Sequence, residues 1–366
     1  MQAKNTRRER DGRARFAPMK SSALRRAALA VSLSFSLLIA PTLHAQDKPA
    51  PADLAAFAQQ TAKAYDLDAK DVLATIAQAK YRQSTVDAMS RPAESVKIWK
   101  DYRPIFVTPK RIAAGRAFFA ANRKALMKVQ ADTGVPAELI CAIIGVETGY
   151  GGNTGSYRVL DALYTLAFWY PHSGDPAKAQ HEDERQAFFR DQLAQLFALA
   201  KEERYPIESL TGSYAGAMGW AQFMPSSYRQ YAKDGDGDGR ADLFGGSMPD
   251  LFASVANYFV GYGWQKGQPV AVRAVHDPAT MAFAPDDLLP NFTLAELGEK
   301  GYRPQESLGH EINGSLLTLD GAQGTEDWIV FQNFYTITRY NHSPMYAMAV
   351  YQLAEAIARK DDDPAP

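Results

Sequence analysis

Cysteine is nearly absent from this chain: its 366 residues include one, Cys141. A single cysteine excludes any disulfide bond within the chain, even in an oxidising compartment. A lone thiol can act as a nucleophile, but Cys141 lies between Ile140 and Ala142 in an apolar segment. Because free cysteines with such neighbours are usually buried, we expect Cys141 to be a core residue.

Long hydrophobic runs are also lacking. An apolar run of 14 residues, 27–40, is shorter than a membrane-spanning helix. It follows a basic segment and precedes Ala45, which indicates a secretory signal peptide over residues 1–45. No cysteine follows the run, so no lipid anchor is predicted at the cleavage site. We therefore expect an exported, periplasmic protein whose mature chain has no transmembrane anchor.

An excess of positive charge is missing as well. The whole chain has 40 Lys and Arg against 41 Asp and Glu, a net charge of −1. Removing residues 1–45 would take away nine basic and two acidic side chains, which leaves 31 and 39 and a net charge of −8. An acidic mature chain argues against nucleic acid as a partner.

What is present is mostly helical pattern, in a composition of 46% hydrophobic and 22% charged residues that is typical of a globular protein. Thr108 and Pro109 provide an N-cap and a first-position proline, so a long helix should begin there. The predicted helices cover about 52–65, 69–81, 109–133, 137–147, 182–203, 228–231, 251–262, 293–299 and 344–359.

Strand composition is confined to residues 270–275, 315–319 and 328–331. The fold class is therefore predicted to be mainly α (α+β). The predicted regions are an N-terminal helical region over 46–135, a helical core over 136–265, a β-rich insert over 266–335 and a C-terminal helix over 336–360 that returns to the core.

The most informative segment is the helix that ends in Glu147. Helical spacing places on one face Ile140, Ile143, Ile144 and Glu147. The helix dipole and the apolar neighbours both disfavour a charged carboxylate there. We therefore expect a raised pKa for Glu147, as a general acid near neutral pH requires. The alternative is an ordinary helix-end glutamate that faces water.

A glycine-rich segment, residues 212–228, is the second signal. Its small residues allow a close approach of the backbone to a partner. Ser213 and Gln222 supply polar groups, and Trp220 and Phe223 add apolar surface. This combination is typical of the wall of a groove for an extended polar ligand, although tight helix packing in a core would use the same residues.

An acidic loop over residues 234–250 is the third signal. Asp234, Asp236, Asp238 and Asp242 take positions 1, 3, 5 and 9 of an EF-hand calcium loop, with glycine at position 6. The Arg240 carbonyl would serve at position 7. Position 12 is Gly245 instead of glutamate, and Asp250 would close a longer loop. We predict one structural Ca²⁺ here; a solvated acidic loop is the alternative.

The fourth signal is the segment from Thr338 to Val350, which we interpret as a strand end, a turn and the final helix. Tyr340, Asn341 and Tyr346 lie in it and are suited to lining a cleft.

Together the four signals resemble the lytic murein transglycosylase B family, which has a lysozyme-like catalytic core. The resemblance rests on the motifs Gly145–Gly151, Gly212–Gly219 with Gln222–Tyr228, the acidic loop, Ser254–Tyr258 and Arg339–Asn341. It implies that Glu147 is the catalytic acid and base. It also implies a glycan cleft lined by Ser213, Gln222, Tyr258, Tyr340, Asn341 and Tyr346. The missing lipid-anchor cysteine matches the soluble, periplasmic branch.

The resemblance further implies a reaction on peptidoglycan glycan strands, in which the MurNAc-β-1,4-GlcNAc bond is cleaved without water to give 1,6-anhydroMurNAc ends. Glycosidases usually use two carboxylates, and the motifs contain no second one in a nucleophile's context. The substrate's own N-acetyl group would then assist Glu147. Such an enzyme would work with other cell-wall enzymes as partners.

Two alternatives stay open at this point. A hydrolytic muramidase on the same fold would release reducing ends instead of anhydro ends. A noncatalytic, calcium-dependent wall-binding protein would need the acidic loop but not a glutamate in an apolar setting.

Overall fold

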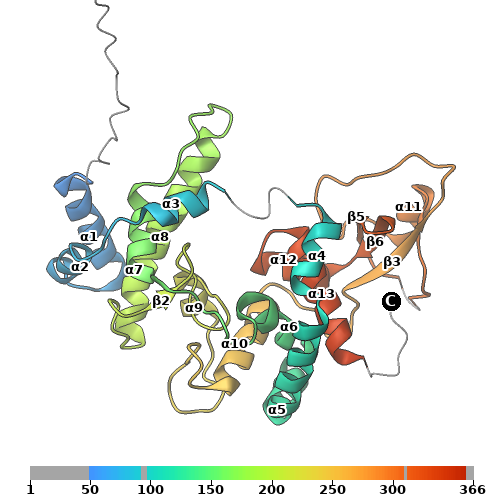
Figure 1. Ribbon diagram of the computed structural model, residues 1–366, viewed down its shortest axis with the longest axis horizontal. Helices are drawn as coiled ribbons and strands as arrows, with labels where there is room; N and C mark the ends of the chain where they lie inside the picture. Colours follow the sequence, from blue (N-terminus) through green and yellow to red (C-terminus); the bar gives the residue numbers. More distant parts are fainter. Residues whose placement is uncertain (1–48, 92–96, 309–310, 360–366) are drawn as a thin grey trace, which may run out of the picture. The chain divides into compact units, whose positions relative to one another are not determined.

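The computed structural model describes residues 49–91, 97–308 and 311–359. The predicted signal peptide, residues 1–45, lies outside them. The helices are α1 Pro51–Tyr65, α2 Ala69–Ile76, α3 Gln83–Met89, α4 Trp99–Phe106, α5 Pro109–Thr133, α6 Ala137–Thr148, α7 Val159–Phe168, α8 Ala179–Glu202, α9 Pro225–Tyr231, α10 Met248–Gly261, α11 Leu294–Glu299, α12 Gln332–Tyr340 and α13 Pro344–Ala358. The strands are β1 Tyr157–Arg158, β2 Thr211–Gly212, β3 Ala271–His276, β4 Tyr302–Pro304, β5 Ser315–Gly321 and β6 Gly324–Val330 (Figure 1).

The mainly α prediction is confirmed, and the cap signals explain where the long helix α5 begins and ends. The Thr108 hydroxyl accepts the Arg111 N–H at 3.1 Å, and Pro109 occupies the first helical position. At the other end Gly134 has φ +76°, the left-handed conformation that commonly stops a helix.

Four of the described helices, α3, α4, α7 and α12, lie outside the predicted helical ranges, and packing explains the last two. In α7 the residues from Val159 to Ala167 are all buried, so no polar face marks the helical period. In α12 the sequence is rich in Thr, Tyr, Phe and Ile, which favour strands. The predicted strand end at Thr338 is therefore wrong, because that residue lies in α12, and this helix begins inside the range predicted for the β-rich insert.

The helix α6 lies at the centre of the main hydrophobic core. Nine of its residues from Leu139 to Thr148 are buried, among them Cys141, which is thus a core residue as expected. The helices α5, α10 and α13 pack against it. Residues on every side of the helix are buried. The apolar face predicted for it is therefore only one part of its buried surface.

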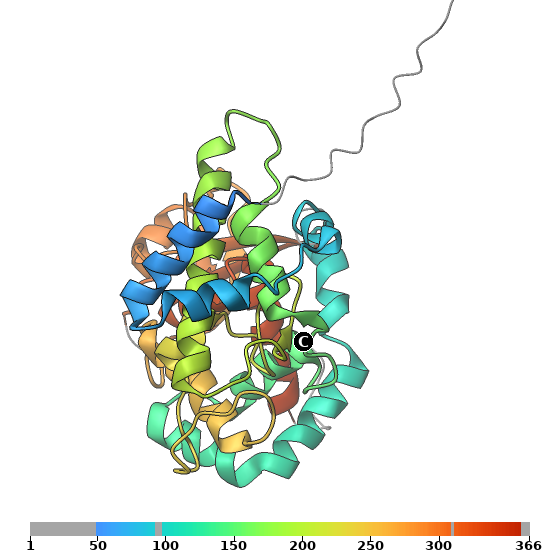
Figure 2. The same cartoon turned by 90° about the vertical axis from the view of Figure 1, so that its left-hand side faces the viewer.

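The N-terminal helices α1 and α2 pack against each other, and α1 also contacts α8 (Figure 2). The ring of Phe57 in α1 meets Phe168 at 5.9 Å and Phe197 at 6.4 Å. The segment after α2 is fixed to α7 by Asp161, a carboxylate that is 1% exposed. Asp161 accepts the Lys80 N–H at 2.9 Å and the Arg82 guanidinium at 2.6 and 2.9 Å.

The β-rich region is an antiparallel four-stranded sheet in the order β4-β3-β6-β5. It has a small hydrophobic core of its own, formed by Val272, Ala274, Leu297, Tyr302, Leu316, Ile329 and Phe331. The helix α4 packs against β5 and against α13, which joins this sheet to the main core (Figure 1).

The described residues from Pro49 onwards belong to one compact unit, so the predicted ranges are regions of that unit. No single described helix is both long and apolar enough to cross a membrane. The helices α5 and α6 meet the conditions of length and composition only as a pair, which is bent by 115° at their junction.

We expect Asp161→Ala to lower the free energy of unfolding by roughly 2–4 kcal/mol, because the Arg82 guanidinium and the Lys80 N–H lose the carboxylate that they bond. The loss should be smaller than for a fully buried pair, since Arg82 is 45% exposed. Urea denaturation measures it, with Asp132→Ala as the control. Asp132 pairs with Lys128 at an exposed surface and should change stability by less than about 0.5 kcal/mol; equal losses would contradict the role given to Asp161.

Candidate active site

Glu147 lies in the last turn of α6 and is partly buried. The helix ends one residue later, where Gly149 adopts φ +59° and its N–H bonds the Gly145 carbonyl at 3.1 Å. The phenol of Tyr346, at the start of α13, donates a short hydrogen bond to Glu147 Oε1. The glutamate is thus held by a neighbouring helix and is not an ordinary helix end that faces water.

Two tyrosines border the Glu147 carboxyl. Tyr346 is 3% exposed, and burial together with the charge of Glu147 raises the pKa of its phenol well above the ordinary value. Burial and Glu147 raise the pKa of Tyr340 in the same way. Both phenols therefore remain neutral at ordinary pH, so Tyr346 stays a hydrogen-bond donor to the carboxylate.

The turn after α6 is fastened to the glycine-rich segment. The buried Thr148 hydroxyl accepts the Gly151 N–H at 3.0 Å and lies 3.1 Å from the Trp220 carbonyl oxygen. Gly155 has φ +90° and lies so close to the Gly212 carbonyl that a Cβ there would overlap it. The strands β1 and β2 pair just beside this contact. The turn that follows α6 and the glycine-rich segment, residues 212–228, are therefore packed together and form one wall of the site.

Ser213 and Gln222 both lie in this wall, half-buried. Ser213 Oγ accepts the N–H groups of Ala215 and Ala217 at 3.3 and 3.1 Å. A hydroxyl that accepts twice still has its proton to donate. Gln222 has φ +50°, unusual for a residue with a side chain. Its amide donates to the carbonyls of Thr154 and Gly219 at 3.1 and 2.8 Å.

The remaining cleft candidates have different placements. The Tyr340 phenol donates to the Ala221 carbonyl at 2.6 Å and so ties α12 to the wall. Tyr258, 5% exposed, donates to the Arg339 carbonyl at 2.6 Å. Its ring packs on that of Tyr340 at 4.8 Å. Asn341 Oδ1 accepts the Ser343 N–H at 3.0 Å. Tyr258 therefore lies in the interior and supports α12.

The acidic loop brings together three of its carboxylates. Asp234, Asp236 and Asp250 each offer an oxygen within 4.8 Å of the others, the one such group among the described residues. Asp250 is 1% exposed and accepts N–H groups from Gly235 and Asp242 at 2.7 and 2.8 Å. Backbone N–H groups of the loop lower the pKa of Asp234. Several converging anionic oxygens form a donor set for a hard cation.

The other two predicted carboxylates, Asp238 and Asp242, are not part of this group. The carboxylate of Asp238 accepts the Arg240 N–H at 2.9 Å, and that of Asp242 accepts the Phe244 N–H at 2.7 Å. The main-chain carbonyl of Arg240, expected at position 7 of the loop, stays a prediction. Among the predicted ligands, the structure therefore gathers Asp234, Asp236 and Asp250.

Two residues of the site have roles that sequence analysis missed. Tyr150 has φ +62°, and its ring fills the space above Gly145 while its phenol donates to the Arg111 carbonyl at 3.1 Å. Thr148 joins the helix end to Trp220. The signal was available in part, since both residues stand within the motif around Glu147, but a motif does not show which contacts its members make.

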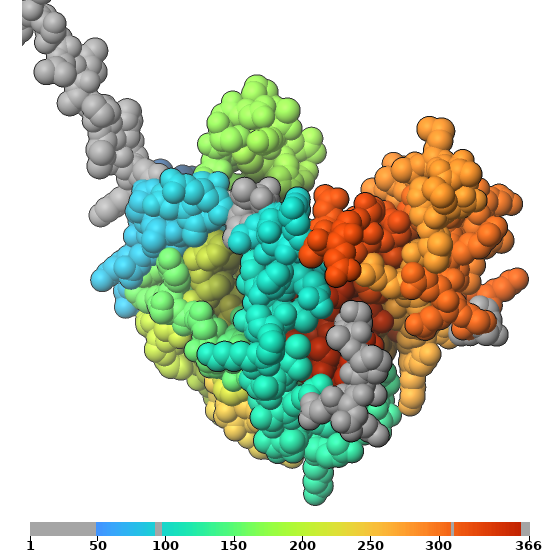
Figure 3. All heavy atoms as spheres, turned by 45° about the vertical axis from the view of Figure 1, so that its right-hand side comes forward, coloured from blue at the N-terminus to red at the C-terminus, as the bar shows by residue number. Residues whose placement is uncertain are grey.

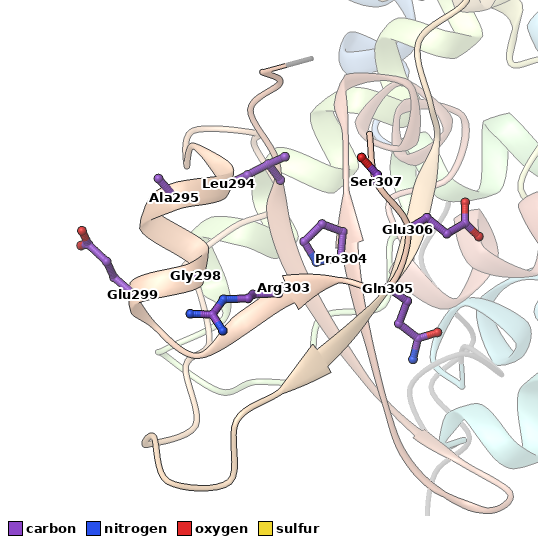
Figure 4. A pocket seen from close by; sticks show the side chains of 9 residues that line it. All are labelled: Leu294, Ala295, Gly298, Glu299, Arg303, Pro304, Gln305, Glu306 and Ser307. Carbon is purple, nitrogen blue, oxygen red and sulfur yellow. The ribbon is translucent and has the colours of Figure 1, made fainter. Parts of the chain in front are cut away.

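One hollow among the described residues is lined by residues that lie away from the candidate site in the sequence. It has a volume of about 790 Å³ and lies between α11 and the end of β4, lined by Leu294, Arg303 and Glu306 among others (Figure 4). A second hollow of about 500 Å³ is lined by Arg339 and His342, which flank Tyr340 and Asn341. The loop before α8 stands out from the surface (Figure 3). Neither hollow includes Glu147.

Comparison with known proteins agrees with this geometry. Residues 50–355 match the model of the family described as transglycosylase SLT domain. The chain is 39% identical over 311 residues to the membrane-bound lytic murein transglycosylase B of Escherichia coli, with 82% of this chain and 81% of that protein covered.

Two solved structures are similar over most of the chain. The catenated lytic transglycosylase SltB1 of Pseudomonas aeruginosa superposes with a TM-score of 0.76 at 43% identity, over 85% of this chain and 98% of that one. The Escherichia coli lytic transglycosylase Slt35, in complex with calcium, gives a TM-score of 0.72 at 38% identity, over 84% and 92%.

We expect Gly155→Ala to destabilise the protein more than Gly149→Ala. Both glycines have positive φ, which costs alanine roughly 1–2 kcal/mol. At Gly149 a Cβ would meet open space, whereas at Gly155 it would overlap the Gly212 carbonyl, which should add about 1–3 kcal/mol. Urea denaturation of both variants tests the contact, and equal losses would mean that the two segments are not packed together.

Proposed function

Because this chain belongs to the transglycosylase SLT domain family and is a peptidoglycan lytic transglycosylase, we propose that Glu147 is its single catalytic acid and base. The observation that carries this proposal is the buried Tyr346 phenol bonded to Glu147 Oε1. A phenol that donates to one carboxylate oxygen restricts the rotation of the carboxyl group and so orients the group that would transfer the proton.

The first step is cleavage of the glycosidic bond. Protonated Glu147 gives its proton to the oxygen that leaves the MurNAc C1 atom, and the carbonyl oxygen of the same sugar's N-acetyl group attacks C1. The C1–O bond breaks as the new bond to the acetamido oxygen forms, so the positive charge passes to a cyclic oxazolinium. The substrate thereby supplies the nucleophile that a second carboxylate supplies in other glycosidases.

The second step closes the anhydro ring. Glu147, now a carboxylate, removes the proton of the C6 hydroxyl, whose oxygen attacks C1 and displaces the acetamido oxygen. The acetamido group returns to its neutral form, and Glu147 is again protonated for the next cycle. No water is consumed, and the product ends in 1,6-anhydroMurNAc.

Ser213 and Asn341 are proposed to hold the N-acetyl group. The Ser213 hydroxyl accepts two backbone N–H groups, which leaves its proton to donate to the acetamido carbonyl. Asn341 follows Tyr340 directly at the end of α12, and Tyr340 bonds the Ala221 carbonyl of the same wall, which supports a role of the Asn341 amide beside Ser213. Gln222, Tyr340 and Tyr258 are proposed to shape the cleft, with Tyr258 acting through its contact with α12.

A hydrolytic muramidase is the competing activity on the same fold. It would direct water to C1, and its products would carry reducing ends. The noncatalytic alternative does not account for Glu147, because a binding protein has no need of a glutamate bonded to a buried phenol.

We also propose that the acidic loop binds one Ca²⁺ through Asp234, Asp236 and Asp250. The fit rests on the convergence of these carboxylates and on the buried position of Asp250. A bound Ca²⁺ would supply charge neutralisation and loop order, and it would take no part in proton transfer. Slt35, the similar enzyme of known structure, is in complex with calcium.

A periplasmic location is part of the same proposal. Its support is the signal-peptide pattern of residues 1–45 together with the site of the substrate, the cell wall.

We expect Glu147→Gln to lower kcat on purified peptidoglycan by at least about 10²–10⁴-fold, the usual contribution of general acid–base catalysis. Glycan binding and the melting temperature should change little, because glutamine keeps the shape of the side chain. Glu138→Gln, at the opposite end of the same helix, is the matched control and should retain activity. More than a tenth of wild-type activity in Glu147→Gln would rule out the assignment.

Calcium should raise the melting temperature of the wild type. A ligand that binds only the folded state at a hundredfold excess over Kd adds about 2.7 kcal/mol of stability. Asp236→Ala should abolish most of this gain, and Asp320→Ala, in the hairpin of the β-sheet, should preserve it. Identical melting curves in millimolar calcium and in excess chelator would show that the loop holds no structural calcium.

A further inference from the structure

Trp220 touches both the acidic loop and the turn that follows Glu147. One part of its indole lies against Gly151, three residues after the end of α6 at Thr148, and another part lies against Gly245 in the acidic loop. A Cβ at either glycine would overlap the ring. The indole therefore fills the space between the two segments, and neither can move toward it without moving the ring.

The backbone of Trp220 makes the same two connections. Its N–H donates to the Leu243 carbonyl at 2.9 Å, and its carbonyl lies 3.1 Å from the Thr148 hydroxyl. Thr148 is 2% exposed and adjoins Glu147 in the chain. Leu243 is fully buried, and its N–H bonds the Tyr228 phenol at 3.3 Å. A continuous series of contacts therefore connects Leu243 in the acidic loop, through Trp220, to Thr148, which precedes the turn and follows Glu147 in the chain.

This packing explains why the loop departs from the standard EF-hand. Position 12, which normally carries a bidentate glutamate, is Gly245, and the indole of Trp220 occupies the place of its side chain. The buried Asp250 supplies a carboxylate from the first turn of α10 instead. At position 12 the loop therefore makes a packing contact with the wall of the active site, where a standard EF-hand has a ligand side chain.

We propose that Trp220 and Thr148 are positioning residues that couple cation binding in the acidic loop to the placement of the Glu147 carboxyl. The proposal rests on the proposed function, in which Glu147 is the acid and base. Ordering the loop fixes Leu243 and Gly245, which fixes Trp220, and Trp220 in turn holds Thr148 and the end of α6.

Calcium itself transfers no proton; the coupling changes the placement of the Glu147 carboxyl, so it affects the rate of proton transfer indirectly and leaves glycan binding unchanged. Couplings carried through packed side chains and hydrogen bonds are typically worth roughly 2- to 30-fold. We therefore expect removal of calcium, at a temperature where the protein stays folded, to lower kcat by about that factor. KM should change by less than about twofold, because an interaction lost only in the transition state lowers kcat and kcat/KM together.

Tryptophan fluorescence tests the first half of the path without any measurement of activity. Trp220 is one of five tryptophans, so titration with CaCl₂ should change the emission of the full-length protein. The change should vanish in Trp220→Phe, while the calcium-induced rise in melting temperature persists in that variant. An unaltered emission change in Trp220→Phe would overturn the proposal.

Two substitutions of Thr148 test the second half. Thr148→Val keeps the shape of the side chain but removes the hydroxyl, and Thr148→Ser keeps the hydroxyl. In Thr148→Val, kcat should already be at the calcium-free level and should no longer respond to calcium, although calcium still raises the melting temperature. Thr148→Ser should respond as the wild type does.

A wild-type response of kcat to calcium in Thr148→Val would overturn the coupling, as would a wild type whose melting temperature and kcat both ignore calcium. Either result leaves Glu147 as acid and base intact, since that assignment is decided by Glu147→Gln in the presence of calcium. Failure of the coupling and failure of the proposed function are therefore distinguishable.

Discussion

The hydrogen bond between the Tyr346 phenol and Glu147 is the interaction on which the site depends. It joins the end of α6 to the start of α13, two helices that lie far apart in the sequence and pack together in the core. In the proposed mechanism this carboxyl serves first as acid and then as base, and it must keep its orientation through both steps. A neutral, buried phenol provides this without adding a second charge to the site.

The rest of the fold supports that contact from three directions. The wall formed by the glycine-rich segment is fixed to the turn after α6 through Thr148 and Gly155. The helix α12 is fixed to the wall by Tyr340 and to α10 by Tyr258. The acidic loop reaches the wall through Trp220. The site is thus built on packed helices and closely approaching backbone, which is the condition for precise placement of one catalytic group.

Sequence reasoning went furthest where local rules decide the structure. The caps of α5, the end of α6 at Gly149 and the final helix after Ser343 were predictable because side-chain caps, glycine and proline act within a few residues. Tertiary packing decided the rest. The strand-forming residues of α12 became helical in the core, and α7 had no polar face to reveal its period. The bond from Tyr346 to Glu147 joins residues 199 positions apart, which no local pattern predicts. The grouping of Asp250 with Asp234 and Asp236 depends on where α10 begins.

The central claim is that one carboxyl, with the substrate's own acetamido group, completes cleavage without water. Digestion of purified peptidoglycan in water enriched in heavy oxygen, followed by mass spectrometry of the released fragments, tests it directly. We predict anhydro ends that contain no heavy oxygen and lack a reducing terminus. Heavy oxygen at a new reducing end would show that water attacks C1 and would contradict the account.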